Sequence, residues 1–480
     1  MHPTALPSKY GIGDFGDTSK NFIDFLNDSS TKIWQVLPLG LTSLDEFSPY
    51  SSPSSILGNR YLIDVEQLTK YEKIDIVSPQ FSNDYVQYKE VYRFKDDIFK
   101  NVSKNINLQD KIFSSFLDDS LIRKHITFLI LKDLNQKSWN EWDNIYQEYS
   151  DDLFDKLFTE NTELVNFHVL TQYEFFNQWG SLKKYANDKN VKILGDIPIY
   201  VNHDSADVWL NKEMFELDET GNMELVSGAV PDSFNMEGQI WGNALYRWDL
   251  HKEDNFKYWK EKLNKSLNLY DYLRIDHFIG FFKFWAIPYG KSALDGHWRD
   301  GPWETFFEKI SNNVNFNKLL AEDLGVVLDT TAQILEKYGI PGMKVLQQRI
   351  PDKTDHDEIN PKNWSESVVA YTGTHDSPTI RQWFDETSSE QINFFNQYKK
   401  ELNNKFESDV WNFISMTWES PCKVAITTIQ DLLELGAEGR FNLPGTQKGN
   451  WKWRIEDLDQ LSEPLEKLKL LNQACERVTT

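Results

Sequence analysis

The stretch YLRIDHFIG, residues 272–280, sets three polar groups into an apolar, β-branched run. The run predicts a buried strand, in which Arg274, Asp276 and His277 would each be costly to bury unpaired. Residues two apart on a strand share a face, so Arg274 and Asp276 point the same way. A guanidinium keeps a neighbouring carboxylate ionised, and an ionised, oriented Asp276 can act as a nucleophile. The alternative is a buried ion pair that only ties strands together.

Six further short apolar runs predict strands of the same kind. They are IWQVLPL (33–39), VKILGDIPIYV (191–201), KLLAEDLGV (318–326), MKVLQQRI (343–350), SVVAYTGTHD (367–376) and KVAITTIQDLL (423–433). Segments with helical spacing lie between them, such as the one that carries Phe22, Phe25 and Leu26. Alternating strands and helices predict an α/β fold with a parallel sheet.

Acidic residues follow several of these runs at the carboxyl end of the predicted strand. They are Asp196, Asp276, Glu322, Asp376 and Asp431. In a barrel of alternating strands and helices, active sites are built at that end from residues on different strands. The pattern therefore predicts a barrel with acids at its mouth.

Glu322 and Asp376 add two further acids to Asp276. Burial at the end of an apolar strand can raise the pKa of Glu322 and make it a proton donor, although an acid at a helix N-terminus is the plainer alternative. His375 precedes Asp376 and can donate a hydrogen bond to a hydroxyl. Two carboxyl groups that flank a glycosidic bond are what glycoside cleavage requires.

Two spacings are too long for plain crossovers between strands. Residues 66–190 have helical periodicity and predict a helical insertion, and residues 203–260 are loop-rich and would lie over the strand ends. The sequence has no repeat, linker or low-complexity tract that would divide it. We therefore expect one catalytic barrel over residues 1–480 with these two insertions.

Composition excludes several classes of function. The formal net charge of −23 argues against a nucleic-acid or anionic-membrane surface. Cys422 and Cys475 are the only cysteines, which favours a reducing, cytoplasmic location. No zinc or phosphate-binding motif occurs, so no metal and no cofactor are expected.

Motifs along the whole chain resemble those of the 4-α-glucanotransferases of the amylomaltase or disproportionating-enzyme type, which belong to the α-amylase superfamily. The residues that carry the resemblance are HPTALPSKYGIGDFG, WQVLPLG, SPY, GNRYLID, GDIPIYVNHDSADVW, GQIWGNALYRW, LRIDHFIG, AEDLG, PGMKVLQ, YTGTHD, DLLELGAEGRFNLPGT and GNWKWR. The resemblance implies a (β/α)8 TIM barrel with helical and loop insertions and no separate C-terminal β-domain. Family members commonly have a strand before the HPT motif, so the first strand of this chain is expected to be nearly absent.

The resemblance also implies transfer of α-1,4-glucan segments to glucose or a maltooligosaccharide acceptor by a retaining double displacement. By motif, the nucleophile falls on Asp276, the acid/base on Glu322 and the stabilising third acid on Asp376. The substrate-binding positions fall on Tyr50, Asp196, Trp241, Arg274, His277, His375 and Asn442. A glucan hydrolase on the same scaffold and a non-catalytic glucan-binding protein are the alternatives. The resemblance leaves the oligomeric state open.

Overall fold

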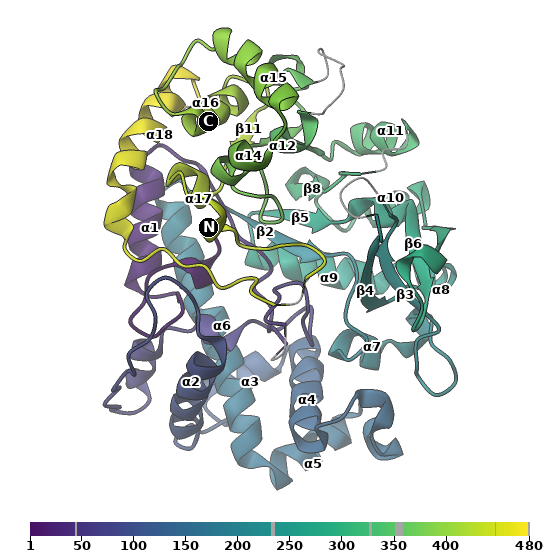
Figure 1. Ribbon diagram of the computed structural model, residues 1–480. Helices are drawn as coiled ribbons and strands as arrows, with labels where there is room; N and C mark the ends of the chain where they lie inside the picture. Colours follow the sequence, from purple (N-terminus) through teal and green to yellow (C-terminus); the bar gives the residue numbers. More distant parts are fainter. Residues whose placement is uncertain (44–45, 232–235, 326–328, 351–358, 447, 479–480) are drawn as a thin grey trace.

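A computed structural model describes residues 1–43, 46–231, 236–325, 329–350, 359–446 and 448–478. Parallel strands occupy the middle of the molecule and helices surround them (Figure 1). The strands of this parallel array are β1 Ile33–Gln35, β2 Lys192–Pro198, β5 Tyr272–Asp276, β8 Leu319–Ala321, β9 Met343–Val345, β10 Val369–Tyr371 and β11 Val424–Ile426. Each lies within one of the seven runs predicted from the sequence, and each is shorter than its run.

The parallel strands pair in the order of the chain. One sheet has the order β1-β2-β5-β8 and the other β9-β10-β11. The backbone N–H of Ala321 donates to Pro341 O (2.9 Å) and that of Val369 donates to Gly342 O (2.9 Å), which joins the two sheets through the segment before β9. The architecture is thus the α/β barrel that the sequence predicted.

The outer edges of β1 and β11 have no strand partner among the described residues. A cavity of about 160 Å³ lies between them, lined by Trp34 on one side and Ile426 on the other, with Met1 and His2 beside it. These free edges mark the place where the sequence analysis expected the first barrel strand to be nearly absent. The described residues after β11 form helices and loops and no separate sheet.

The strand predicted over residues 272–280 ends earlier, at Asp276. His277 adopts a left-handed conformation with φ of 52°, and a 3₁₀ turn follows at Phe278–Phe281. The prediction was wrong for residues 277–280 because the chain turns at the barrel mouth instead of continuing the strand. Left-handed backbone at a non-glycine residue is strained, and such strain is often found at functional sites.

A second, antiparallel sheet lies beside the barrel (Figure 1). Its order is β4-β3-β6-β7, and its strands are β3 Leu225–Ala229, β4 Gln239–Ala244, β6 Lys283–Pro288 and β7 His297–Asp300. The region 203–260, predicted to be loop-rich, contributes β3 and β4 to this sheet. The region after β5 contributes the other two strands.

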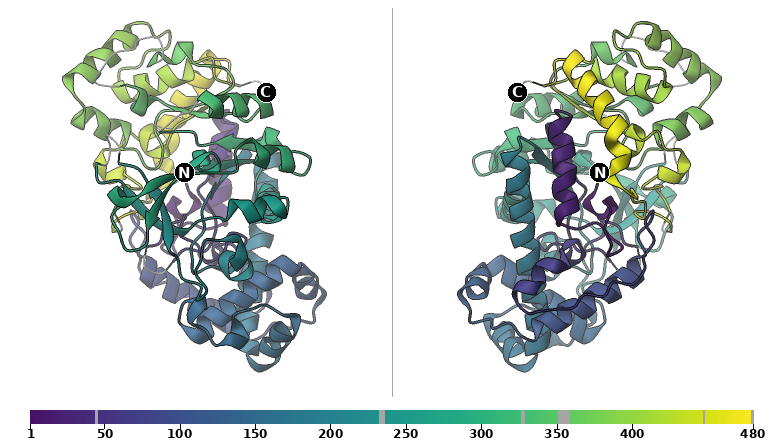
Figure 2. Two further views of the ribbon diagram at one scale, coloured as in Figure 1. Left: turned by 90° about the vertical axis from the view of Figure 1, so that its right-hand side faces the viewer. Right: turned by 90° about the vertical axis from the view of Figure 1, so that its left-hand side faces the viewer.

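Helices pack around and beyond the barrel. Three helices of the predicted insertion, α3, α4 and α5, lie at one end of the molecule. Two helices from the C-terminal part of the chain, α15 and α16, lie at the other end (Figures 1 and 2). The helices are α1 Asp17–Asp28, α2 Tyr88–Ser103, α3 Lys111–Leu117, α4 Ser120–Asn135, α5 Asp151–Glu160, α6 Thr162–Asp188, α7 Ala206–Leu210, α8 Trp248–Glu253, α9 Lys257–Leu269, α10 Glu304–Ile310, α11 Asp329–Tyr338, α12 Leu346–Arg349, α14 Ile380–Glu386, α15 Ser389–Lys400, α16 Asp409–Trp418, α17 Ile429–Leu432 and α18 Ser462–Ala474.

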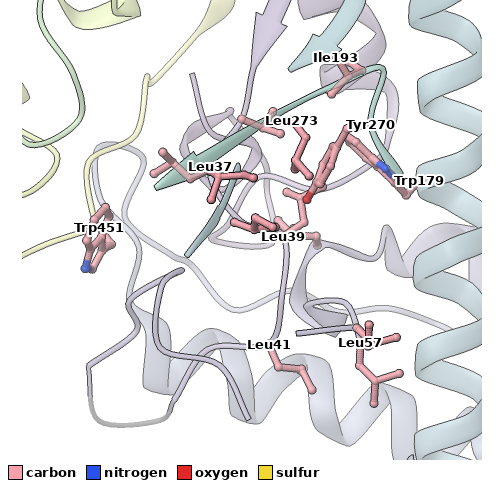
Figure 3. Packing of buried hydrophobic residues seen from close by; sticks show 14 of the residues in the cluster. Leu37, Leu39, Leu41, Leu57, Trp179, Ile193, Tyr270, Leu273 and Trp451 are labelled. Atoms are coloured by element: carbon pink, nitrogen blue, oxygen red, sulfur yellow. The ribbon is translucent and has the colours of Figure 1, made fainter. Parts of the chain in front are cut away.

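Close packing fixes the position of strand β5 relative to strand β2 and helix α6. Figure 3 shows Tyr270, just before β5, beside Trp179 of α6, and their ring centroids are 6.2 Å apart. The Tyr270 ring also lies against the backbone of Gly195 on β2, where an added Cβ would come within 2.2 Å of the ring. Only glycine fits at that position, so the ring can lock β2 and β5 together beneath the mouth.

Candidate active site

A groove of about 1100 Å³ lies at the carboxyl ends of the barrel strands. All the site residues predicted from the sequence line it except Asp196. They come from loops and strands far apart in the chain and are Tyr50, Trp241, Arg274, Asp276, His277, Glu322, His375, Asp376 and Asn442. The groove is also the place where the second sheet, through β4, meets the barrel.

Asp276 and Glu322 end neighbouring strands at the same level. The register pairs Ile275 with Ala321, so the next residues, Asp276 and Glu322, face each other across β5 and β8. Two backbone bonds continue the pairing, because Glu322 N donates to Ile275 O (3.0 Å) and Phe278 N donates to Glu322 O (2.9 Å). Adjacent strands are roughly 4.8 Å apart. In retaining glycosidases the two carboxyl groups are about 5–5.5 Å apart, and this register suits that close spacing.

Glu322 is held by the backbone and carries a raised pKa. Its carboxylate accepts hydrogen bonds from His277 N (2.7 Å) and Leu324 N (2.9 Å), which fix its direction. Burial raises the pKa of Glu322 to about 7, and the nearby charge of Asp276 adds to the rise. A carboxyl group with such a pKa can give and take a proton near neutral pH.

Arg274 links two carboxylates beneath the groove. Its Nη2 lies 2.8 Å from Asp276 Oδ1, and its Nη1 donates to Asp196 Oδ2 (2.6 Å). The side chain is 5% exposed, so water screens these charges little. Asp276 is 31% exposed at its side chain and reaches the groove. The contact with Arg274 holds the Asp276 carboxylate in one orientation at the edge of the groove.

Asp196 differs from its predicted role as a substrate-binding residue. Its side chain is fully buried, and it accepts hydrogen bonds from Arg274 and from the hydroxyl of Tyr50 (2.9 Å). It does not line the groove, because Arg274 and Tyr50 lie over it. Its hydrogen bonds hold the side chains of Arg274 and Tyr50, which both line the groove.

Replacing Arg274 by methionine should destabilise the fold. Arg274→Met leaves Asp196 and Asp276 without their cation, and breaking a buried pair in this way costs about 3–5 kcal/mol of unfolding free energy. Urea titration measures the change. The double variant Asp196→Asn/Arg274→Met should recover part of the loss, because one unpaired carboxylate is removed with its partner.

Arg247→Met is the matched control for this prediction. Arg247 forms an exposed ion pair with Asp249, with side chains 46% and 66% exposed, and exposed pairs contribute less than about 1 kcal/mol. Equal losses in Arg274→Met and Arg247→Met would contradict the structural role of Arg274.

Asp376 lies across the groove in a polar setting. Asn442 Nδ2 donates to Asp376 Oδ1 (2.6 Å), and His375 Nε2 lies 3.4 Å from the same oxygen. Arg440 donates to the backbone oxygen of Asp376 (3.2 Å). Burial lowers the pKa of His375, so its imidazole is neutral at pH 7 and can both donate and accept. Such an arrangement can bind the hydroxyls of a sugar ring.

His277 and Trp241 form the wall toward the second sheet. Their rings meet edge to face with centroids 4.6 Å apart, and Tyr200 lies 6.3 Å from each ring. Burial lowers the pKa of His277 to about 4, which leaves it neutral. The flat face of Trp241 beside neutral hydrogen-bonding groups suits the apolar and polar sides of a sugar.

Sequence reasoning missed several groove residues. Tyr200, Gln348, Asn450 and Trp451 also line the groove, and Trp451 lies 6.0 Å from the Tyr50 ring. Tyr200 and Trp451 belong to motifs that the resemblance covers, so those motifs were the available signal. The position of Gln348, in the helical turn after β9, gave no signal of its own.

Asp431 lies apart from the groove, unlike Asp276, Glu322 and Asp376. It falls in α17, where its carboxylate accepts a hydrogen bond from Ile380 N (2.7 Å) and the residue is 1% exposed. Its strand, β11, ends at Ile426, so a helical turn carries Asp431 away from the mouth.

Among the residues that the structure describes, His, Cys, Asp and Glu side chains form no group of three or more that could hold a metal ion. None of the helices described combines the length and the apolar character needed to span a lipid bilayer.

Comparison with known proteins gives consistent matches over the whole chain. A family model described as 4-alpha-glucanotransferase matches residues 1–460. The 4-alpha-glucanotransferase of Clostridium butyricum is 38% identical over 99% of this chain and 100% of its own length. That of Aquifex aeolicus is 37% identical over 98% of this chain and 97% of its own length.

Solved structures agree with these sequence matches. The amylomaltase of Streptococcus agalactiae, in complex with acarbose, has a TM-score of 0.90 at 33% identity, covering 99% of this chain and 98% of that one. The amylomaltase of Corynebacterium glutamicum shares the fold, with a TM-score of 0.79 at 15% identity over 98% of this chain and 74% of that one.

Proposed function

This chain belongs to the 4-alpha-glucanotransferase family, and from that premise we propose how the residues of its groove divide the reaction between them. The enzyme transfers α-1,4-glucan segments between maltooligosaccharides by a retaining double displacement. We assign the role of nucleophile to Asp276 and that of acid/base to Glu322. Asp376 binds hydroxyl groups of the reacting sugar.

The first half of the reaction cleaves the donor. Asp276 attacks the anomeric carbon with a carboxylate oxygen, and the bond to the glycosidic oxygen breaks. Glu322 gives its proton to that departing oxygen, so the leaving segment departs with a free 4-hydroxyl. A glucosyl ester on Asp276 and an ionised Glu322 remain.

The second half rebuilds the linkage on another sugar. The 4-hydroxyl of an acceptor attacks the anomeric carbon from the side that the leaving segment vacated. Glu322 takes the hydroxyl proton as the new bond forms, and the ester bond to Asp276 breaks. Two inversions restore the α-configuration, and both carboxyl groups return to their starting states.

The remaining groove residues bind and orient the two sugars. Arg274 orients the carboxylate of Asp276, and Asp376 with Asn442 binds hydroxyls of the reacting ring. Donor and acceptor are an α-1,4-glucan and glucose or a maltooligosaccharide. The complex of the Streptococcus agalactiae amylomaltase with acarbose supports a ligand of this class in the groove.

Transfer requires that an acceptor sugar compete with water for the covalent intermediate. Trp241 on β4 and the segment around Asn442 line the groove from two sides, and both stand next to glycine-containing turns. Side chains that pack against the acceptor and exclude water favour transfer over hydrolysis.

The observation that carries the proposal is the register of β5 and β8. It sets Asp276 and Glu322 opposite each other at one mouth, with Arg274 paired to the former and backbone N–H groups bound to the latter. A carboxylate paired with an arginine, next to a carboxyl group of raised pKa, suits the nucleophile and the acid/base of a retaining mechanism.

Incubation with maltotriose alone tests the activity. We expect a ladder of shorter and longer oligosaccharides, because a transferase passes glucose or maltose units to another maltotriose. Chromatographic sizing of the products reads the result. Products no longer than maltotriose would support a hydrolase instead, and binding without turnover would support a non-catalytic glucan-binding protein.

We also propose that residues 1–480 act as one catalytic unit in the cytoplasm. A continuous hydrophobic core joins residues from Ala5 to Leu471, which supports one unit with insertions at about 66–190 and 203–260. Cys422 and Cys475 are both free thiols, as expected for a reducing compartment.

A further inference from the structure

The antiparallel sheet has one face toward the barrel and one face away from it. Register pairs Trp285 with Trp298 across β6 and β7, and Ile287 with Val226 across β6 and β3. By alternation, Trp285, Ile287 and Trp298 share one face, and Phe284 lies on the other. Phe284 belongs to the main core, whereas Val226 and Ile287 form a small separate cluster with Ala293. The face with Trp285 is therefore the outer face.

Large apolar side chains remain exposed on this outer face and on the turn Ala293–Asp295, which packs against it. Trp298 is 40% exposed, Tyr289 65% and Leu294 63%. The Trp285 and Trp298 rings meet edge to face with centroids 5.3 Å apart. Tyr289 follows Ile287 by two residues, and its N–H still donates to Glu224 O (2.9 Å), so it continues the same face. We call Trp285, Tyr289, Leu294 and Trp298 the outer aromatic patch.

One short turn separates this patch from the catalytic groove. Ser292 and Ala293 line the groove, and Trp285 Nε1 donates to Ala293 O (2.9 Å) from the patch side. A capping box between Ser292 and Asp295 fixes the turn. Gly296 lets it approach the Trp285 ring, since a Cβ there would come within 2.2 Å of the indole nitrogen. The turn is thus a rigid wall shared by groove and patch.

We propose that the outer aromatic patch binds further glucose units of a long α-glucan whose reacting end lies in the groove. The inference rests on the proposed function and extends it to a preference for long chains. Sugar rings have apolar faces that pack against aromatic rings, and a neutral chain is not repelled by a protein with a net charge of −23. The exposed side chain of Asp300, on the same face of β7 as Trp298, can accept hydrogen bonds from sugar hydroxyls nearby.

A protein partner fits this surface less well. Stable protein–protein contacts bury on the order of 1,200 Å² or more, and this patch consists of a few side chains on one edge of a small sheet. Its continuity with the groove through Ala293 instead matches an extended, neutral ligand that already occupies the groove.

The double variant Tyr289→Ala/Trp298→Ala tests the proposal against a matched control. Native electrophoresis in gels that contain amylose measures binding, and transfer kinetics with amylose and with maltotriose measure use of the long chain. We expect amylose to bind about tenfold more weakly, because the variant loses two aromatic rings that pack against the apolar faces of sugars. In the double variant, KM for amylose should rise by a similar factor. KM for maltotriose should change much less, because maltotriose is too short to reach from the groove to the patch.

Tyr272→Ala is the control, because Tyr272 is 39% exposed but lies at the opposite end of β5 from Asp276. It should change neither amylose measurement. The inference would be overturned if the double variant bound amylose as well as the unmodified enzyme does, or if Tyr272→Ala lost as much amylose binding as the double variant. Equal rises in KM for amylose and for maltotriose in the double variant would also overturn it. Failure of the proposed function itself would look different, since the unmodified enzyme would then not disproportionate maltotriose.

Discussion

Asp276→Asn is expected to abolish glucan transfer while leaving the fold intact. Asparagine has nearly the same shape and can still accept a hydrogen bond from Arg274, but its amide cannot form the glucosyl ester. Loss of a nucleophile that acts together with an acid/base should lower kcat for maltotriose disproportionation by about four orders of magnitude or more. Arg274 keeps its bond to Asp196, so the barrel core stays paired.

Product sizing after long incubation measures the residual activity, and circular dichroism with thermal unfolding checks the fold. Asp152→Asn is the control: Asp152 is exposed at the start of α5 and does not line the groove, so transfer should be unchanged. A folded Asp276→Asn variant with more than a few per cent of the original kcat would refute Asp276 as the nucleophile.

Glu322→Gln should slow transfer by about two to four orders of magnitude, the usual contribution of a general acid/base. The loss should depend on the leaving group. A maltosyl fluoride donor needs no proton to lose fluoride, so its first step should continue in this variant. The second step lacks its base, and the ester on Asp276 should therefore accumulate and be detectable by mass spectrometry.

The pH dependence of the unmodified enzyme should follow Glu322. Burial raises the pKa of its carboxyl group to about 7, so the group is mostly protonated below pH 7 and mostly ionised above it. Because donor cleavage needs the protonated form, kcat/KM for maltotriose should fall as the pH rises through about 7. Glu322→Gln should lose this alkaline decline, since glutamine does not titrate.

Asp323→Asn is the matched control for both Glu322 predictions. Asp323 is adjacent in sequence but points away from the groove and accepts a hydrogen bond from Met343 N (2.7 Å), which asparagine can still accept. Its rate and pH profile should therefore resemble those of the unmodified enzyme. If Asp323→Asn removed the alkaline decline and Glu322→Gln kept it, the acid/base assignment would be wrong.

Hydrophobic patterning predicted the barrel well because its strands are buried on both faces and read as unbroken apolar runs. The antiparallel sheet escaped prediction for the opposite reason. LVSGA and QIWGNA, which become β3 and β4, interrupt their apolar residues with glycine and polar residues, so neither segment forms an unbroken apolar run. The pairing of β3 with β4 and with β6, rather than the composition of these segments, makes them strands.

Strand ends were the least predictable part of the barrel. The run at 272–280 stays apolar after Asp276, so periodicity alone continued the strand, whereas the left-handed turn at His277 ends it. The same turn brings the N–H of His277 to Glu322. Such a bond joins residues far apart in sequence, and no local pattern records it.

The alternation of strands and helices, the family, and the acids that follow barrel strands could all be predicted from the amino-acid sequence, because burial and periodicity are local properties of the chain. Which of those acids line the groove became clear from the folded molecule alone. Asp276, Glu322 and Asp376 reach the groove, while Asp196 lies under Arg274 and Tyr50, and Asp431 turns away in α17. The direction of a side chain at a strand end depends on the turn that follows and on partners brought in from distant segments, and those contacts exist only in the folded molecule.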